Sequence, residues 1–220
     1  MAGLRRVLFD FEVLNFWDIP HRRTRTKADC RNEDAWADWL FYKGVRERWD
    51  EVEGISWPKR VTPLRGDARE HWAADNISIL SPTRELVAEC DKADVYNDAS
   101  YVLMFRHATS RVLLASDIEE RAWLDIIDAG INLQAHVLIA SHHGRKSGYC
   151  DEAMQHIRPN AVIISTGKPA SKDDAIGDYR RHTQHVFSTR VDGDTQITMW
   201  DDGDLDICDA EGTRLARFVD

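Results

Sequence analysis

The sequence predicts a layered α/β domain with mixed sheets, and two observations carry this prediction. Between residues 76 and 182, short apolar runs typical of buried strands alternate with segments of helical periodicity. Three of these runs end on polar side chains, at Asp117, at the pair His142–His143 and at Ser165. Open α/β sheets place their functional sites at such carboxyl ends of strands, so these side chains are candidates for chemistry.

The composition is typical of a soluble globular protein. Of the 220 residues, 43% are hydrophobic and 30% are charged. No run of about 18 apolar residues is present to span a membrane, and the first residues carry charges inside their apolar run, unlike a secretory signal. The four cysteines are far apart and form no CxxC pair. We therefore expect a reduced, cytoplasmic protein with no membrane partner.

Charge is distributed unevenly along the chain. The formal net charge of −9 argues against a broad electrostatic grip on nucleic acid. The segment HRRTRTK (21–27) is strongly basic, whereas WDDGDLDICDAEG (200–212) is acidic. The basic segment lies in a loop predicted over 21–32. We interpret it as a solvated loop, with contact to phosphates as the alternative.

The first 75 residues are predicted to form an insertion and a partial N-terminal region. One strand or two short strands are expected over 7–19. Apolar residues at helical spacing predict one helix over about 32–52, with Asn32 or Asp34 as its cap.

Residues 76–220 are predicted to form the strand-rich part of the chain. Strands are expected over 76–80, 100–107, 110–117, 137–141, 160–166, 185–193, 194–200 and 204–208, and helices over 84–92, 118–131, 151–157 and 173–182. The strands on either side of the link "AT" are expected to pair as a hairpin, and the last strands to form terminal β-hairpins.

The histidine pair follows directly on a predicted buried strand. Adjacent side chains of an extended strand point to opposite faces, so at most one of His142 and His143 faces the site if that geometry continues. The other then packs or holds a carboxylate. Imidazole together with the carboxylate of Asp117 is a ligand set that zinc or manganese favours. Alternatively, Asp117 caps a helix and the histidines are structural.

One sequence pattern links these residues. Asn97 and Ser100, which in isolation read as a turn residue and a cap, precede the strand expected to pair with that of Asp117. The order N-x-x-S, strand, L-x-x-D, helix, VLIxxHHG, strand and S-x-G resembles the metallo-β-lactamase superfamily. It is similar in particular to the second half of the hydrolase domains of bacterial DNA-uptake (competence) channel proteins. The match covers roughly residues 76–200.

The resemblance implies an αββα sandwich with a metal site at one edge of the sheets. Asp117 would bridge two metal ions, and one of the two histidines, with His142 as first choice over His143, would be the last ligand. Asn97 would stand where many members carry a further histidine ligand. Zinc is the expected metal and manganese the alternative. Two such ions bind a phosphodiester, as in nucleic acid, and activate water for its hydrolysis.

The resemblance also implies substrate contacts beside the histidine pair. Arg145 or Lys146 would neutralise phosphate charge, with a solvated loop as an equal interpretation for both cations. Ser165, in the S-x-G segment, would contact the substrate as well.

The superfamily's defining HxHxDH motif is absent from this chain. His21, His71 and His107 lack a partner at ligand spacing. We therefore expect only the second half of the sandwich, preceded by a helical insertion. Either the chain is truncated, or a companion chain or second copy supplies the missing half, or the protein is a degenerate member.

Two functions follow as expectations. The first is a metal-dependent hydrolase, a phosphodiesterase or nuclease, that acts when a homo-oligomer or companion chain completes the site. The second is a non-catalytic binding or interaction module built on a degenerate copy of the fold. A plain α/β domain with a structural HHG is the third interpretation.

Overall fold

The chain divides into two compact units. A computed structural model describes residues 3–47, 58–67, 71–167 and 172–219. The units comprise Met1–Pro63 and Leu64–Asp220, so the boundary expected at residue 75 falls inside the second unit. None of the described helices combines the length and the apolar character needed to cross a lipid bilayer.

The first unit is built on a short parallel ribbon and two helices. Its elements are α1 (Leu4–Asp10), β1 (Asn15–Trp17), the 3₁₀ turn η1 (Lys27–Asp29), α2 (Glu33–Glu47) and β2 (Lys59–Val61). Strands β1 and β2 pair in parallel. The predicted helix is confirmed over α2, and its expected last residues, 48–52, lie outside the described residues. Asn32 caps α2, since its Oδ1 accepts a hydrogen bond of 2.9 Å from the Ala35 amide.

The strand predicted over 7–19 is wrong in its first part, which is helix α1. Leu4 and Leu8 are four residues apart and share one helix face, on which Leu8 is buried. Such a short apolar run fits both helical and extended periodicity, and packing against α2 decides for the helix.

The second unit contains one large and one small sheet. Its strands are β3 (Ile77–Ser81), β4 (Val102–His107), β5 (Ser110–Leu114), β6 (Val137–Ile139), β7 (Ala161–Ile164), β8 (His185–Ser188), β9 (Gln196–Met199), β10 (Leu205–Cys208) and β11 (Arg214–Phe218). Its helices are η2 (His71–Asp75), α3 (Arg84–Ala93), α4 (Glu120–Asp128), η3 (Ser141–Gly144), α5 (Asp151–Ile157) and α6 (Ile176–Tyr179).

The large sheet is mixed, as predicted. Its six strands follow the order β3-β4-β5-β6-β7-β8, and β9, β10 and β11 form a separate three-stranded sheet. Strands β3, β4 and β5 are antiparallel neighbours, whereas β5, β6, β7 and β8 run parallel. The predicted α/β fold class and the hairpin of β4 and β5 are therefore confirmed.

The terminal hairpins are only partly as predicted. Strands β8 and β9 do not pair with each other, because β8 adds in parallel to β7 while β9 pairs with β10. The strand β11, which pairs with β10, has no counterpart in the sequence prediction. The turn between these two β-rich runs therefore does not form a hairpin, because each run pairs with a different strand, β7 or β10.

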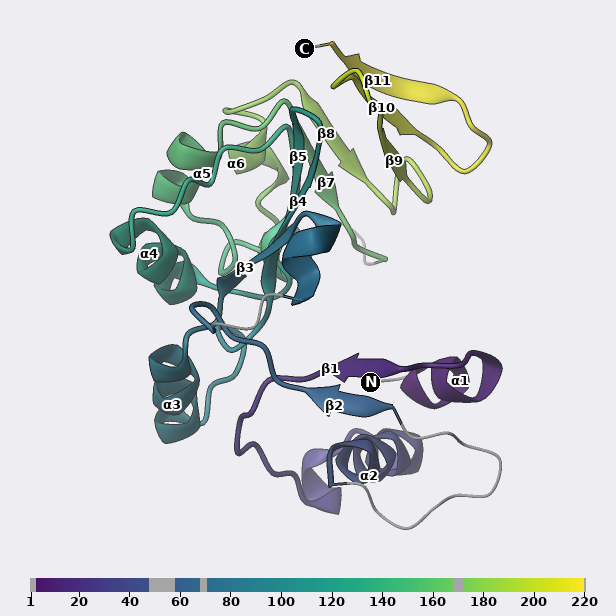
Figure 1. The fold of residues 1–220 in the computed structure, drawn as a ribbon, viewed down its shortest axis with the longest axis vertical. Coiled ribbons are helices and arrows are strands. Elements are labelled where there is room, and N and C mark those ends of the chain that lie inside the picture. Colours follow the sequence, from purple (N-terminus) through teal and green to yellow (C-terminus); the bar gives the residue numbers. More distant parts are fainter. Residues whose placement is uncertain (1–2, 48–57, 68–70, 168–171, 220) are drawn as a thin grey trace. The chain divides into compact units, whose positions relative to one another are not determined.

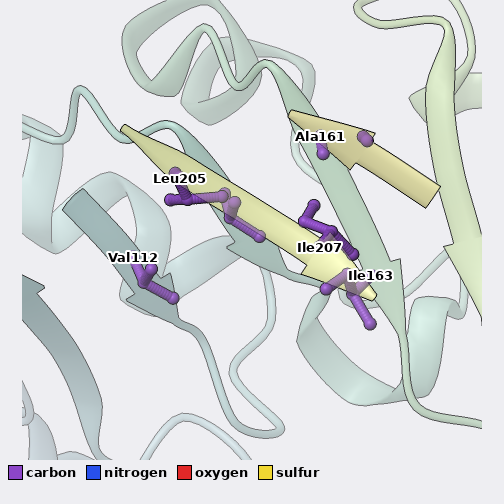
Figure 2. Close-up of a cluster of buried hydrophobic side chains, with 7 residues drawn as sticks. Val112, Ala161, Ile163, Leu205 and Ile207 are labelled. Atoms are coloured by element: carbon purple, nitrogen blue, oxygen red, sulfur yellow. The ribbon is translucent and has the colours of Figure 1, made fainter. Parts of the chain in front are cut away.

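The two sheets pack face to face. Helices α4, α5 and α6 lie on one face of the large sheet, and the small sheet covers the other (Figure 1). Figure 2 shows Leu205 and Ile207 of β10 against Val112, Ala161 and Ile163 of the large sheet. All five side chains are buried, so this contact forms a large part of the hydrophobic core.

We predict that Ile207→Ala lowers the free energy of unfolding by about 2–5 kcal/mol, because it leaves a cavity between the sheets. Ile207 has no exposed surface. Denaturant unfolding measures the change, with Val191→Ala as control because Val191 is 72% exposed and its truncation should cost about 0.5 kcal/mol or less. Equal effects of the two substitutions would contradict the packing of the small sheet described above.

Candidate functional site

The parallel strands bring four of the predicted site residues to one edge of the large sheet. Leu114 of β5 is in register with Ile139 of β6, and Ile139 with Ile163 of β7. The segments that follow these strands therefore emerge at the same edge. They carry Asp117, the histidine pair and Ser165.

The histidine pair lies in a tight left-handed turn and not in an extended strand. His142, His143 and Gly144 have φ angles of 46°, 58° and 72°. The expected alternation of the two side chains applies to extended backbone and therefore does not hold here. The turn is fixed by its backbone: the His142 amide donates to the Ser116 carbonyl at 2.9 Å, and the Gly144 carbonyl accepts from the Ala175 amide at 2.8 Å.

His143 is the histidine that faces Asp117. Its Nε2 lies 3.7 Å from Asp117 Oδ1, and both side chains are about half exposed. On the other side of the ring, Nδ1 lies 2.8 Å from the Ser165 carbonyl oxygen. A carbonyl can only accept, so Nδ1 carries a proton, and in the neutral form of the ring the lone pair is on Nε2, which lies towards Asp117.

His142 belongs to a second, more buried cluster. Its Nδ1 lies 3.1 Å from Glu119 Oε1 and 2.9 Å from the Ser147 hydroxyl. The same Glu119 oxygen accepts a hydrogen bond of 3.2 Å from Asn97 Nδ2. Asn97 and His142, predicted as ligands, are thus both held by Glu119, which the sequence analysis missed. The position of Glu119 two residues after Asp117 was the available signal.

The N-terminus of α4 is capped by Asp98 and not by Asp117. Asp98 Oδ1 accepts hydrogen bonds from the amides of Glu119, at 2.7 Å, and Ala122, at 3.3 Å. This removes the capping interpretation of Asp117. Burial is the main cause that raises the pKa of Asp98, and the neighbouring charge of Glu119 adds to it. Asp98 lies beside Asn97 in sequence and was also missed.

Two glycines in or near the turn pack too closely against neighbouring atoms to carry a side chain. A Cβ on Gly144 would lie 2.6 Å from Cγ2 of the buried Ile164, and one on Gly148 would lie 2.7 Å from the Cβ of His142. The carbonyl of Gly148 accepts a hydrogen bond of 3.0 Å from the indole of Trp123. Side chains at either glycine would therefore displace the histidine turn.

The two predicted substrate-binding cations follow the turn directly. The side chains of Arg145 and Lys146 are exposed. Their backbone is fixed, because the Lys146 amide donates to the Asp173 carbonyl at 2.8 Å and Arg145 forms a β-bridge with Asp174. The backbone of both cations is therefore held by hydrogen bonds, directly after the turn that carries His143.

The described residues contain no complete set of metal ligands. Across the described ranges, no three His, Cys, Asp or Glu side chains come together in a way that would hold a metal ion. All four cysteines are free thiols. Asp117 and His143 together could supply two donors, whereas a catalytic zinc takes three protein ligands. The residues therefore fit one portion of a metal site.

Two known bacterial proteins are similar to this chain. ComE operon protein 3 of Bacillus subtilis is 29% identical over 106 residues, which are 46% of this chain and 13% of that protein. Recombination protein 2 of Haemophilus influenzae is 26% identical over 136 residues, 60% of this chain and 16% of that protein. A search against known protein families finds no match.

The similarity covers only part of these relatives. The chain spans less than a fifth of the length of either one. At this level the matches confirm the coarser part of the expected resemblance, which is to bacterial DNA-uptake proteins.

We predict that Gly144→Ala lowers the free energy of unfolding by about 1–3 kcal/mol more than Gly130→Ala, because of overpacking against Ile164. The two glycines have similar φ angles, 72° and 67°, but a Cβ on Gly130 would meet nothing within 4 Å. The comparison therefore separates the steric contact from backbone strain, and denaturant unfolding measures both. Equal losses would show that Ile164 does not limit this position.

We predict that the stability of the wild type relative to Asp98→Asn falls as the pH rises above about 4. Asparagine keeps the accepting oxygen and does not titrate. Because the pKa of Asp98 is raised on folding, its contribution is fully present below the unfolded pKa and is lost as pH rises through the folded pKa. Denaturant unfolding at a series of pH values measures the difference; a difference that grows with pH would contradict the assignment.

Proposed function

We propose that this chain contributes Asp117 and His143 to the site of a metal-dependent phosphodiester hydrolase of the metallo-β-lactamase type. The observation that carries the proposal is the pairing of these two side chains at the carboxyl edge of the parallel strands, with Nε2 of His143 lying 3.7 Å from Asp117 Oδ1. His143 takes the ligand role in place of His142, because Nε2 of His143 lies beside Asp117, whereas the contacts of His142 are with Glu119 and Ser147.

Each residue has a defined part in this proposal. Asp117 supplies an oxygen donor and His143 a nitrogen donor, and the Ser165 carbonyl holds the His143 ring in one tautomer. A divalent ion bound there, zinc or alternatively manganese, would supply an activated water for attack on phosphorus. Arg145 and Lys146 offer exposed positive charge to the phosphodiester. Glu119 and His142 position the turn.

The remaining ligands must come from outside the described residues. A companion chain or a second copy of this chain is the proposed source, since two donors alone hold zinc weakly. The names of the two relatives, one of which includes the word recombination, support nucleic acid as the substrate class. A non-catalytic binding module is the second candidate, and the lack of a third donor among the described residues favours it.

We predict that the purified chain binds zinc and that the double substitution Asp117→Asn, His143→Gln weakens this binding at least about tenfold, because it removes both donors. Calorimetric titration with zinc measures the affinity. The matched control is His107→Gln, Asp201→Asn, which removes another His–Asp pair of 2.8 Å elsewhere in the unit and should leave zinc binding unchanged. His142→Gln should have a smaller effect than His143→Gln.

Hydrolysis separates the two candidate functions. Zinc- or manganese-dependent cleavage of bis(p-nitrophenyl) phosphate that is lost in the double variant supports the hydrolase. Zinc binding without cleavage, in the chain alone and with its companion, supports the binding module. Equal zinc binding by the wild type and the double variant sinks the proposed site.

A further inference from the structure

A cationic hollow lies within the first unit. It has a volume of about 240 Å³ and is formed by residues of the loop after β1, the later turns of α2 and strand β2. Six cations line it: Arg22, Arg23, Arg25, Lys43, Arg46 and Arg60. Among the described lining residues, Glu47 is the only carboxylate, and it pairs with Lys43 at 3.8 Å.

A buried carboxylate holds two of these arginines in place. Asp18 is 5% exposed, and its Oδ2 accepts hydrogen bonds from Nε of Arg46 at 2.7 Å and Nε of Arg60 at 2.8 Å. Its Oδ1 accepts from the hydroxyl of Tyr42 at 2.8 Å, whose pKa is raised, chiefly by burial. One negative charge thus fixes two positive ones, so this cluster keeps a net positive charge with guanidinium groups already oriented.

The charge of the hollow contrasts with the rest of the chain. Residues 1–63 contain 12 Lys and Arg against 11 Asp and Glu, whereas residues 64–220 contain 17 against 27. An extended polyanion is repelled by the overall charge of the second unit. Such a ligand is therefore expected to bind chiefly at the basic segment of the first unit.

We propose that this hollow binds phosphate groups of a single-stranded nucleic acid. Five of the six cations are arginines, whose planar fork matches phosphate oxygens in bidentate geometry. Among the residues that the structure describes, the six cations exceed the carboxylates of Asp18 and Glu47 by four charges, more than one phosphate group requires. A flexible strand can bend its backbone into a hollow of this size, whereas a stiff duplex cannot.

This site is independent of the proposed hydrolase site. It uses none of Asp117, His143 or their neighbours. The double variant Asp117→Asn, His143→Gln should therefore bind the strand as the wild type does, and failure of one proposal leaves the other standing.

The test is binding of a fluorescent oligothymidylate of about 15 nucleotides to the full chain, followed by anisotropy over a range of salt concentrations. We expect Arg22→Gln, Arg25→Gln to weaken binding at least about tenfold, because two charged contacts are lost. The slope of log affinity against log salt should fall by about 1.4. The matched control is Arg5→Gln, Arg6→Gln on α1, outside the hollow, which removes the same charge and should change affinity less than about twofold.

Further controls test for misfolding of the variants and for binding of other ligands. Arg22→Lys, Arg25→Lys keeps the charge but not the planar fork and should restore part of the affinity, and both variants leave Asp18, Arg46 and Arg60 in place. Inorganic phosphate and a polyglutamate of matched charge serve as competitors. Equal binding by the Arg22→Gln, Arg25→Gln variant and the control, binding of polyglutamate as tight as that of the strand, or binding of free phosphate but not of the strand would each overturn the proposal.

Discussion

The parallel pairing of β5, β6 and β7 is the constraint on which the candidate site depends. Each strand is buried on both faces: Val112, Val137 and Ala161 pack towards the small sheet, and the residues that follow them point to the helices. A slip of one residue would exchange these faces along a whole strand. Core packing thus fixes the register, and the register fixes where the next polar residues emerge.

The arrangement at that edge divides into an exposed and a sheltered part. Asp117 and His143 are open to solvent, whereas His142 and Glu119 are largely enclosed and hold the backbone beneath them. Asp98 joins the same region to α4, because its carboxylate accepts hydrogen bonds from the amides of Glu119 and Ala122. The separation fits a site in which one pair meets the ligand and the other maintains the turn.

The central strands and helices could be predicted from the sequence because their periodicity is local and strong. The helix predicted over 151–157 is α5 with the same bounds. The roles of Glu119 and Asp98 could not, since both depend on contacts across more than 20 residues. Strand β8 was assigned to the wrong neighbour for the same reason: only tertiary packing decides between β7 and β9. The tautomer of His143 likewise depends on the Ser165 carbonyl.

The left-handed turn also carries a cost in stability. Non-glycine residues at positive φ cost of order 1–3 kcal/mol each, and His142 and His143 occupy two such positions in succession. Glycine at either position would relieve the strain without altering the chain path. His142 offsets part of this cost through its contacts with Glu119 and Ser147, and His143 does so through the Ser165 carbonyl. The strained backbone and the two ring contacts are therefore maintained together.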